Sequence, residues 1–260
     1  MNYRLSKTIN DQQLSPHYLG LAIGNSRLHW GLFYNYNLID SGDSNHLSCS
    51  GDREKLIQQI LGDRQLDSLT IYLASVVPEQ TKLWLEYPQV KLITLSDIPL
   101  NNLYSTLGID RALAVWGAGN KYGYPCLVID GGTALTFTAV DNKQSLVGGA
   151  IVPGLRSQLH SLQQKTAALP EINLPPSLPA RWALDTQSAI ASGIIYSAIA
   201  TVVDFINDWC VLFPHSKLIL TGGDSKLLYD YLHNSQQLLT TAIVVDPHLI
   251  FWGMELVISH

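Results

Sequence analysis

The strongest constraint on the fold is a pattern that occurs twice along the chain. An apolar strand at residues 18–24 passes through Asn25 and Ser26 into a second strand, RLHWGLFY, and then a third, LID. From Cys126 onward, the stretch CLVIDGGTALTFTAVDNKQSLVGGAIVPG repeats the plan of strand, glycine turn, strand, turn and strand. We interpret the two stretches as copies of one unit. A chance likeness between two common turns is the alternative.

Each copy continues with alternating helices and strands. In the first copy we predict helices at 53–61, 79–87 and 110–122, with strands LTIYLASVV and VKLITL between them. In the second copy we predict helices at 154–168, 186–213 and 224–233, the strand LILTGG, and a closing strand and helix within AIVVDPHLIFWGMELV. A proline-rich connection, LPEINLPPSLPARW, is expected to be an ordered excursion or a lid. The pattern predicts an α/β fold with mixed sheets.

Composition narrows the class of partner. The 260 residues are 47% hydrophobic and 14% charged, which is typical of a well-cored globular protein. A net charge of −5 without a run of Lys or Arg argues against nucleic acid as a partner. We find no stretch of the roughly 20 apolar residues that cross a bilayer, and residues 1–16 read as a polar extension without a signal-peptide core. We therefore expect no membrane partner.

The cysteines indicate the compartment. An odd, widely spaced set fits neither a disulfide framework nor a zinc site, and it suits a reducing environment. A cytoplasmic location follows as an expectation. The cysteines are Cys49, Cys126 and Cys210.

Glycine turns at strand ends are candidate phosphate loops. Exposed amides and a hydroxyl group at residues 24–26 and 131–133 would cradle an anion. If the two loops face each other, they would hold the phosphates of a nucleotide from both sides, although a plain hairpin turn is the alternative for each. In a third loop, TGGD at 221–224, the glycines would admit an adenine or a ribose, and Asp224 is placed to cap the next helix. An ordinary strand-to-helix turn is the alternative there.

Two carboxylates carry the candidate chemistry. Asp130 ends an apolar strand, where it would hold a cation beside phosphate oxygens or act as a simple turn residue. Asp110 and Arg111 open an apolar helix behind Gly108. An aspartate at that position is often only a cap, but a cation is disfavoured in the first turn of a helix. An aspartate that accepts a hydroxyl proton, beside an arginine that orients an anionic substrate, is what phosphoryl transfer to an alcohol requires.

Taken in order, these segments resemble the type III pantothenate kinases, which belong to the acetate-and-sugar-kinase, heat-shock-protein and actin superfamily. The resemblance runs from Tyr18 to the C-terminus. It implies two ribonuclease-H-like (actin-like ATPase) domains, at 17–120 and 121–260, a homodimer, and ATP-dependent phosphorylation of pantothenate, the first step of coenzyme A biosynthesis. The motifs that carry it are IGNS (23–26), ASVVP (74–78), LGIDR (107–111), DGGTALT (130–136), GGAIVPG (148–154), Thr186 with SGII behind it, and TGGD (221–224).

The resemblance also implies roles for individual residues. Asp110 would accept the hydroxyl proton of pantothenate. Asp130 would bind a monovalent cation, K⁺ or NH₄⁺, and Mg²⁺ would accompany ATP. Tyr104 is a looser match, because the family's substrate tyrosine usually lies where this chain has Asn101. The residues that would contact pantothenate are Tyr104, Gly108, Ile109, Asp110, Arg111 and, from the partner subunit, Thr186. Those that would contact ATP are Ala22, Ile23, Gly24, Asn25, Ser26, Arg27, Leu28, His29 and Thr133, joined by Gly222 and Gly223 of the third loop.

One departure from the family pattern bears on activity. The first loop of the family usually reads Asp-x-Gly-Asn-Thr, whereas this chain has Ala22 and Ser26 at the first and last positions. Serine keeps the hydroxyl group, but alanine removes a carboxylate that helps to position magnesium. This implies a weaker metal–ATP interaction and a slower enzyme. A non-catalytic or low-activity nucleotide-binding accessory factor, and a kinase for another small hydroxyl compound, remain the alternatives.

Overall fold

Two five-stranded sheets form the framework. The computed structural model describes residues 17–64, 69–165, 172–237 and 242–259, so the extension predicted at 1–16 lies outside it. The first sheet has the order β3-β2-β1-β4-β5 and the second the order β10-β9-β6-β7-β8. The strands are β1 (His17–Ile23), β2 (Leu28–Tyr34), β3 (Asn37–Ser44), β4 (Thr70–Ser75), β5 (Val90–Leu92), β6 (Cys126–Gly131), β7 (Ala134–Val140), β8 (Leu146–Pro153), β9 (Lys217–Thr221) and β10 (Ile243–Val245).

The two sheets share one topology. In each, three strands form an antiparallel meander, and the first of them also pairs in parallel with a strand that follows a helix. A further parallel strand completes each sheet. The repeat predicted from the sequence is therefore confirmed as two copies of one unit.

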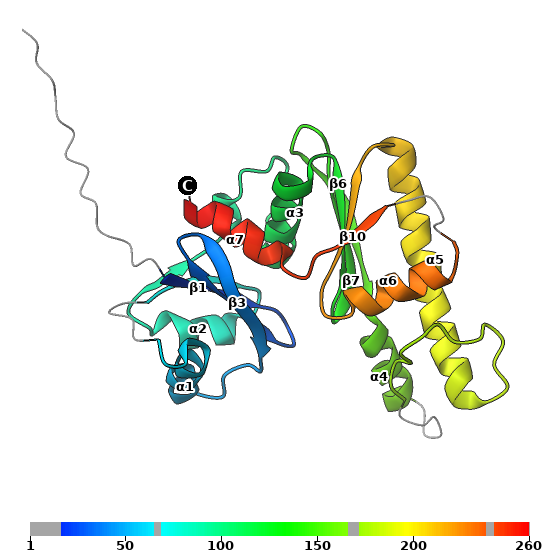
Figure 1. Ribbon diagram of the computed structural model, residues 1–260, viewed down its shortest axis with the longest axis horizontal. Coiled ribbons are helices and arrows are strands. Elements are labelled where there is room, and N and C mark those ends of the chain that lie inside the picture. The colour runs from blue at the N-terminus through cyan, green and yellow to red at the C-terminus, as the bar shows by residue number, and fades with distance from the viewer. Residues whose placement is uncertain (1–16, 65–68, 166–171, 238–241, 260) are drawn as a thin grey trace, which may run out of the picture.

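Helices cover the sheets in three layers (Figure 1). One buried cluster joins α1 (Ser50–Leu61) and α2 (Pro78–Leu85) to the outer face of the first sheet. A second joins α4 (Leu155–Lys165), α5 (Thr186–Leu212) and α6 (Ser225–Asn234) to the outer face of the second sheet. Between the sheets lie α3 (Ile109–Tyr122) and α7 (Leu249–Ser259), while a short 3₁₀ helix spans Leu95–Asp97.

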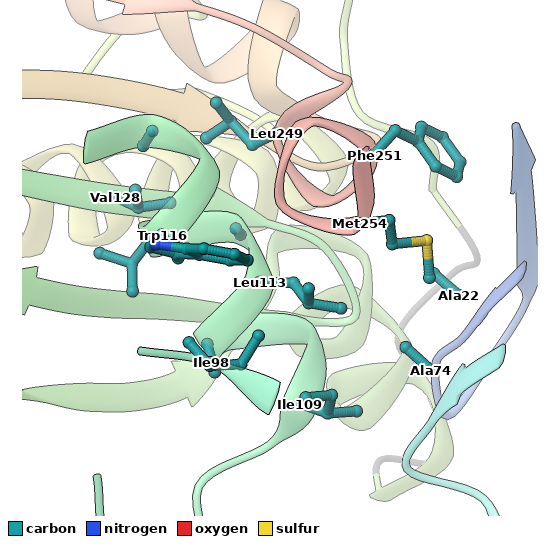
Figure 2. Packing of buried hydrophobic residues seen from close by; sticks show 14 of the residues in the cluster. Ala22, Ala74, Ile98, Ile109, Leu113, Trp116, Val128, Leu249, Phe251 and Met254 are labelled. Carbon is teal, nitrogen blue, oxygen red and sulfur yellow. The ribbon is translucent and has the colours of Figure 1, made fainter. Parts of the chain in front are cut away.

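The central layer ties the two halves together. Figure 2 shows side chains of α3 and α7 meeting, with Ala22 and Ala74 of the first sheet on one side and Val128 of β6 on the other. The two helices cross at glycines: a Cβ at Gly117 would lie 2.5 Å from the carbonyl oxygen of Leu249. The C-terminal helix therefore packs against the N-terminal half of the chain, and a division near residue 120, at the end of α3, remains our proposal for the domain boundary.

One sequence expectation about membranes is corrected. By length and composition α5 is long and apolar enough to cross a bilayer, with a mean hydropathy of 1.9, whereas we expected no such stretch. The reason for its apolar character is packing, because one side of α5 belongs to the core of the second sheet. Phe205 of α5 stacks on Phe137 of β7 with ring centroids 4.2 Å apart. These contacts are those of a core helix.

The described part of the proline-rich connection, from residue 172, is held by hydrogen bonds. The hydroxyl of Tyr231 donates to the carbonyl of Pro175, and that of Tyr196 donates to the carbonyl of Pro179 at 3.0 Å. Ser192 likewise donates to the carbonyl of Arg181 at 2.7 Å. This portion is an ordered excursion over α5 and α6; residues 169–171 and the predicted helical residues 166–168 lie outside the described part.

Candidate active site

The first two glycine loops meet between the sheets. Each is a tight turn: Gly24 N–H donates to the carbonyl of Arg27 at 3.0 Å, and Gly132 N–H donates to that of Ala134 at 3.1 Å. The hydroxyl of Thr133 then donates to the hydroxyl of Ser26 at 2.8 Å. The two loops are therefore in direct contact, which meets the condition for a phosphate site shared between them.

Residues of the first loop differ in what they offer a ligand. Ala22, Ile23 and Leu28 are buried, so they would present only backbone groups. Exposed side chains come from the turn itself, at 25–27. His29, at the start of β2, is half exposed and pairs with Asp43. The accessible polar side chains of the loop therefore lie at the turn and just after it.

Asp110 lies in the first turn of α3 rather than at its cap. The helix begins at Ile109 with Gly108 as the N-cap residue, and Asp110 Oδ1 accepts the N–H of Arg111 at 2.8 Å. A Cβ at Gly108 would collide with the Asp110 carboxylate, so this glycine makes room for it. Ile109 is buried beneath the turn and anchors it in the central core.

Arg111 links α3 to the second sheet. Its guanidinium donates from Nε to Thr138 Oγ1 at 3.0 Å and from Nη2 to the carbonyl of Phe137 at 2.8 Å. Its Nη1 donates to the hydroxyl of Tyr104 at 3.2 Å, which brings the loosely matched tyrosine into the same cluster. The arginine is held in place by three partners and keeps N–H groups for a ligand.

Asp130 is a carboxylate in an unfavourable environment for charge. Burial and, after it, the negative charge of Asp110 raise its pKa to about 6, while the positive charges of His29 and Arg111 partly offset the shift. The charge of Asp110 therefore acts on Asp130, although the two residues lie on different elements. Gly222, with φ at +87°, allows the third loop to pass close by, because a Cβ there would collide with Asp130 Oδ1.

The third loop contacts the second, but Asp224 does not cap α6 with its side chain as predicted. Asp224 N–H donates to the carbonyl of Gly131 at 2.8 Å. Its side chain makes no capping hydrogen bond to α6; instead Asp224 Oδ1 accepts Arg156 Nε at 3.0 Å. A charged donor from α4 thus replaces the backbone amide as partner. Gly223 has open space where a side chain would stand.

Several contacts in the site involve residues that the sequence did not indicate. Ser157 donates to the carbonyl of Thr133 at 2.6 Å, and His46 Nε2 contacts the carbonyl of Gly24 at 2.8 Å. Both contacts hold the first two glycine loops in place. Ser157 and His46 are distant in the sequence from the residues that they contact, so no local sequence pattern predicts these contacts.

A cavity of about 390 Å³ opens beside the start of α3. Five of its twelve lining residues carry hydroxyl groups and six are apolar; they come from the end of β4, from α2, from β5 and the segment after it, and from the loop that precedes α3 and the first residue of α3. Such a wall suits a small ligand that carries both apolar and hydroxyl groups. The lining residues are Ser75, Val76, Thr81, Leu92, Ile93, Thr94, Leu95, Ser105, Thr106, Leu107, Gly108 and Ile109.

Thr186, a predicted pantothenate contact, does not lie near Asp110 within one chain. It is the first residue of α5, exposed, behind the cap residue Asp185, which accepts Ser188 N–H at 2.9 Å. That end of α5 is drawn far from α3 (Figure 1).

A cation at Asp130 would find few protein ligands. Within the described residues, no group of three or more His, Cys, Asp or Glu side chains is placed to hold a metal ion. Hard cations accept carboxylate, carbonyl, phosphate and water oxygens alike. The Asp130 carboxylate at the strand end fits such an ion when phosphate oxygens supply most of the remaining ligands.

Comparisons with known proteins agree on one family. A family model described as type III pantothenate kinase matches residues 18–208. A type III pantothenate kinase of Nostoc sp. is 46% identical, with 95% of this chain and 98% of the relative covered. One of Synechocystis sp. is 45% identical, with 94% and 91% covered.

Solved structures agree on the fold. A protein of Campylobacter jejuni assigned to the Baf family of transcriptional activators superposes with a TM-score of 0.63 at 22% identity, covering 93% of this chain and 97% of that one. MreB 5 of Spiroplasma citri bound to AMPPNP gives 0.51 at 8% identity, covering 92% and 95%. At such identities the likeness extends to the fold alone, and it confirms the predicted pair of ribonuclease-H-like domains.

Proposed function

This chain belongs to the type III pantothenate kinase family, and from that premise we propose how its residues divide the work. The enzyme phosphorylates pantothenate with ATP, which yields 4′-phosphopantothenate in the first step of coenzyme A biosynthesis. The roles of individual residues, the cation and the oligomeric state are our proposal.

ATP lies with its phosphates between the first two loops. The observation that carries this placement is the hydrogen bond from Thr133 to Ser26, because it joins the equivalent loops of the two halves at one point. Both hydroxyl groups and the loop amides are donors for phosphate oxygens. Gly222 packs against Asp130 and Gly131 of the second loop, and the position beside Gly223 is open. The nucleoside would lie there, next to the phosphates.

Pantothenate lies at the start of α3, with its primary hydroxyl at Asp110. As the hydroxyl oxygen bonds to the γ-phosphorus and the bond to the ADP oxygen breaks, Asp110 takes the hydroxyl proton. Arg111, held by Tyr104, Phe137 and Thr138, orients the substrate carboxylate. The cavity beside Gly108, with its mixed apolar and hydroxyl wall, accommodates the rest of the molecule.

Asp130 is the carboxylate for a cation that accompanies ATP, Mg²⁺ or a monovalent K⁺ or NH₄⁺. When bound, the cation supplies positive charge against the phosphates. A cation also removes the cost of a charged Asp130, whose burial and neighbour Asp110 disfavour ionisation. Thr186 contacts pantothenate from the partner subunit of a homodimer, and the enzyme works in the cytoplasm.

The experiment that tests this function is ADP release from the purified protein with ATP, magnesium and pantothenate, with and without potassium. We expect turnover that requires pantothenate and is stimulated by potassium. Turnover with another small hydroxyl compound, but not with pantothenate, would overturn the assignment of pantothenate as the substrate. No turnover from a folded protein that still binds ATP would favour the accessory factor, the alternative that Ala22 keeps open.

A further inference from the structure

One row of side chains runs across the antiparallel part of the first sheet, at the end nearest the phosphate loop. Ala22 of β1 is directly opposite His29 of β2, and His29 is directly opposite Asp43 of β3. Side chains of directly opposed residues point to the same face of a sheet, with Cβ atoms about 4.5–5.5 Å apart. The three residues therefore share one face.

That face is the one that looks toward the central layer and the second sheet. Ala22 belongs to the central core beside Met254 of α7 (Figure 2). Two residues further along β3 from Asp43, and therefore on the same face, Ser41 contacts His248 near the start of α7, with Oγ and Nε2 3.2 Å apart. The side chains of His29 and Asp43 are 43% and 50% exposed. The segment at the start of α7 therefore covers the sheet at Ser41 and leaves His29 and Asp43 accessible.

His29 and Asp43 form a pair whose orientation leaves one nitrogen free. Nδ1 of His29 contacts Asp43 Oδ1 at 2.5 Å. This contact turns Nε2 away from β3, and we find no contact for Nε2 among those of the described residues. His29 stands three residues after Ser26, whose hydroxyl meets Thr133. His29 is also among the groups that lower the pKa of Asp130, next to the second glycine loop.

We propose that His29 binds ATP through a hydrogen bond from Nε2 to an oxygen of the terminal phosphate, and that Asp43 is the residue that positions it. The inference rests on the proposed function, because it needs the phosphates between the two loops. In this arrangement the two ring nitrogens face different partners, Nδ1 the carboxylate of Asp43 and Nε2 the phosphate. The ring would thus contact the phosphate from the position directly opposite Ala22, which offers no carboxylate for a metal.

The test compares nucleotides that differ at the terminal phosphate. Binding of β,γ-imido-ATP and of ADP is measured by calorimetry for the wild type, His29→Gln and Asp43→Asn. We expect His29→Gln to weaken the ATP analogue roughly tenfold to a hundredfold, as for the loss of a charge-assisted hydrogen bond, and to leave ADP within about twofold. Asp43→Asn should show a smaller loss of the same selectivity, and His29→Lys should restore part of it.

Matched controls separate this role from a structural one. Asp40→Asn removes an exposed carboxylate from the same strand and should leave both affinities unchanged. Unfolding temperatures identify any variant that fails to fold. If His29→Gln does not fold, the inference is judged by whether Asp43→Asn weakens the ATP analogue more than ADP. In turnover, KM for ATP should rise while KM for pantothenate stays constant.

Equal loss of the analogue and ADP, or no loss of either, would overturn the inference. A wild type that binds the analogue through His29 but does not phosphorylate pantothenate would instead overturn the proposed function and leave this inference standing.

Discussion

At the scale of single residues, Asp110 and Asp130 are two carboxylates with different surroundings. Asp110 accepts a backbone N–H in the first turn of a helix, whereas Asp130 lies at a buried strand end where negative charge is disfavoured. Environments that separate two carboxylates in this way commonly separate their roles. We propose proton transfer for Asp110 and cation binding for Asp130.

Replacing Asp110 with asparagine tests the first role. The variant should fold and bind ATP normally, because Asn keeps the shape and can still accept the Arg111 N–H. Turnover should fall by about 100- to 10 000-fold, the usual contribution of a general base. Initial rates under saturating ATP and pantothenate provide the measurement, and near-normal turnover would rule out Asp110 as the base.

Replacing Asp130 with asparagine tests the second role through stability. Because the pKa of Asp130 is raised in the folded protein, stability falls as pH rises from about 4 to about 6, and ionised Asp130 costs stability above that. In cation-free buffer at pH 7, Asp130→Asn should therefore stabilise the protein by roughly 1 to 3 kcal/mol. The gain should vanish near pH 4, and turnover should be lost.

Chemical denaturation at the two pH values checks this. A variant that is less stable than the wild type at pH 7 without cations would contradict the environment described for Asp130.

At the scale of elements, the crossing of α3 and α7 positions the site. Asp246, just before α7, accepts hydrogen bonds from Lys121 Nζ at 2.9 Å, from the Tyr122 hydroxyl at 2.6 Å and from Trp252 Nε1 at 2.9 Å. These contacts fix the end of α3 to the start of α7. The first turn of α3, with Asp110 and Arg111, is thereby held against both sheets.

A methyl group at this crossing should be costly. In Gly253→Ala the new Cβ would meet the backbone of Leu113 with no flexible side chain to give way, so the helices must separate. We expect a loss of about 1–3 kcal/mol or more, with reduced turnover as α3 shifts. Gly51→Ala, in α1, is the matched control, since its Cβ would meet only Cys49 Sγ at 3.9 Å. It should be neutral or slightly stabilising, and equal losses in both variants would contradict close packing as the cause.

At the scale of the whole molecule, Thr186 at the start of α5 lies far from Asp110 at the start of α3 (Figure 1), yet both are proposed to contact pantothenate. A homodimer with two-fold symmetry would reconcile this, because each site would take Thr186 from the other subunit. Exposed apolar side chains near the start of α5, Trp182 and Leu184, are suited to such a contact.

Mixing two inactive variants tests this arrangement. In a hybrid of Asp110→Asn and Thr186→Ala subunits, one site carries both changes and the other carries neither. After subunits are exchanged by mild denaturation and refolding, random pairing should recover about a quarter of wild-type turnover. The unmixed variants, treated in the same way, are the control. No recovery in a mixture that contains hybrids would place Thr186 outside the partner's site.

The sequence by itself determined the repeat, the strand and helix order, and the presence of glycine loops at strand ends. These follow from local patterns: alternation and apolar runs set the strands, and glycine next to hydroxyl residues sets the turns. Asp110, Arg111 and Asp130 were identifiable because each breaks an otherwise apolar element at its end. The departure at Ala22 was equally visible.

Only the tertiary structure decided which of these groups meet. The contact of Ser26 with Thr133, the partners of Arg111, the pairing of His29 with Asp43 and the Arg156 partner of Asp224 join segments far apart in the chain. The apolar character of α5 and the return of α7 to the first half also depend on packing between elements. Local propensities act over a few residues, whereas these contacts arise when buried faces from the two halves are brought together, so no local pattern encodes them.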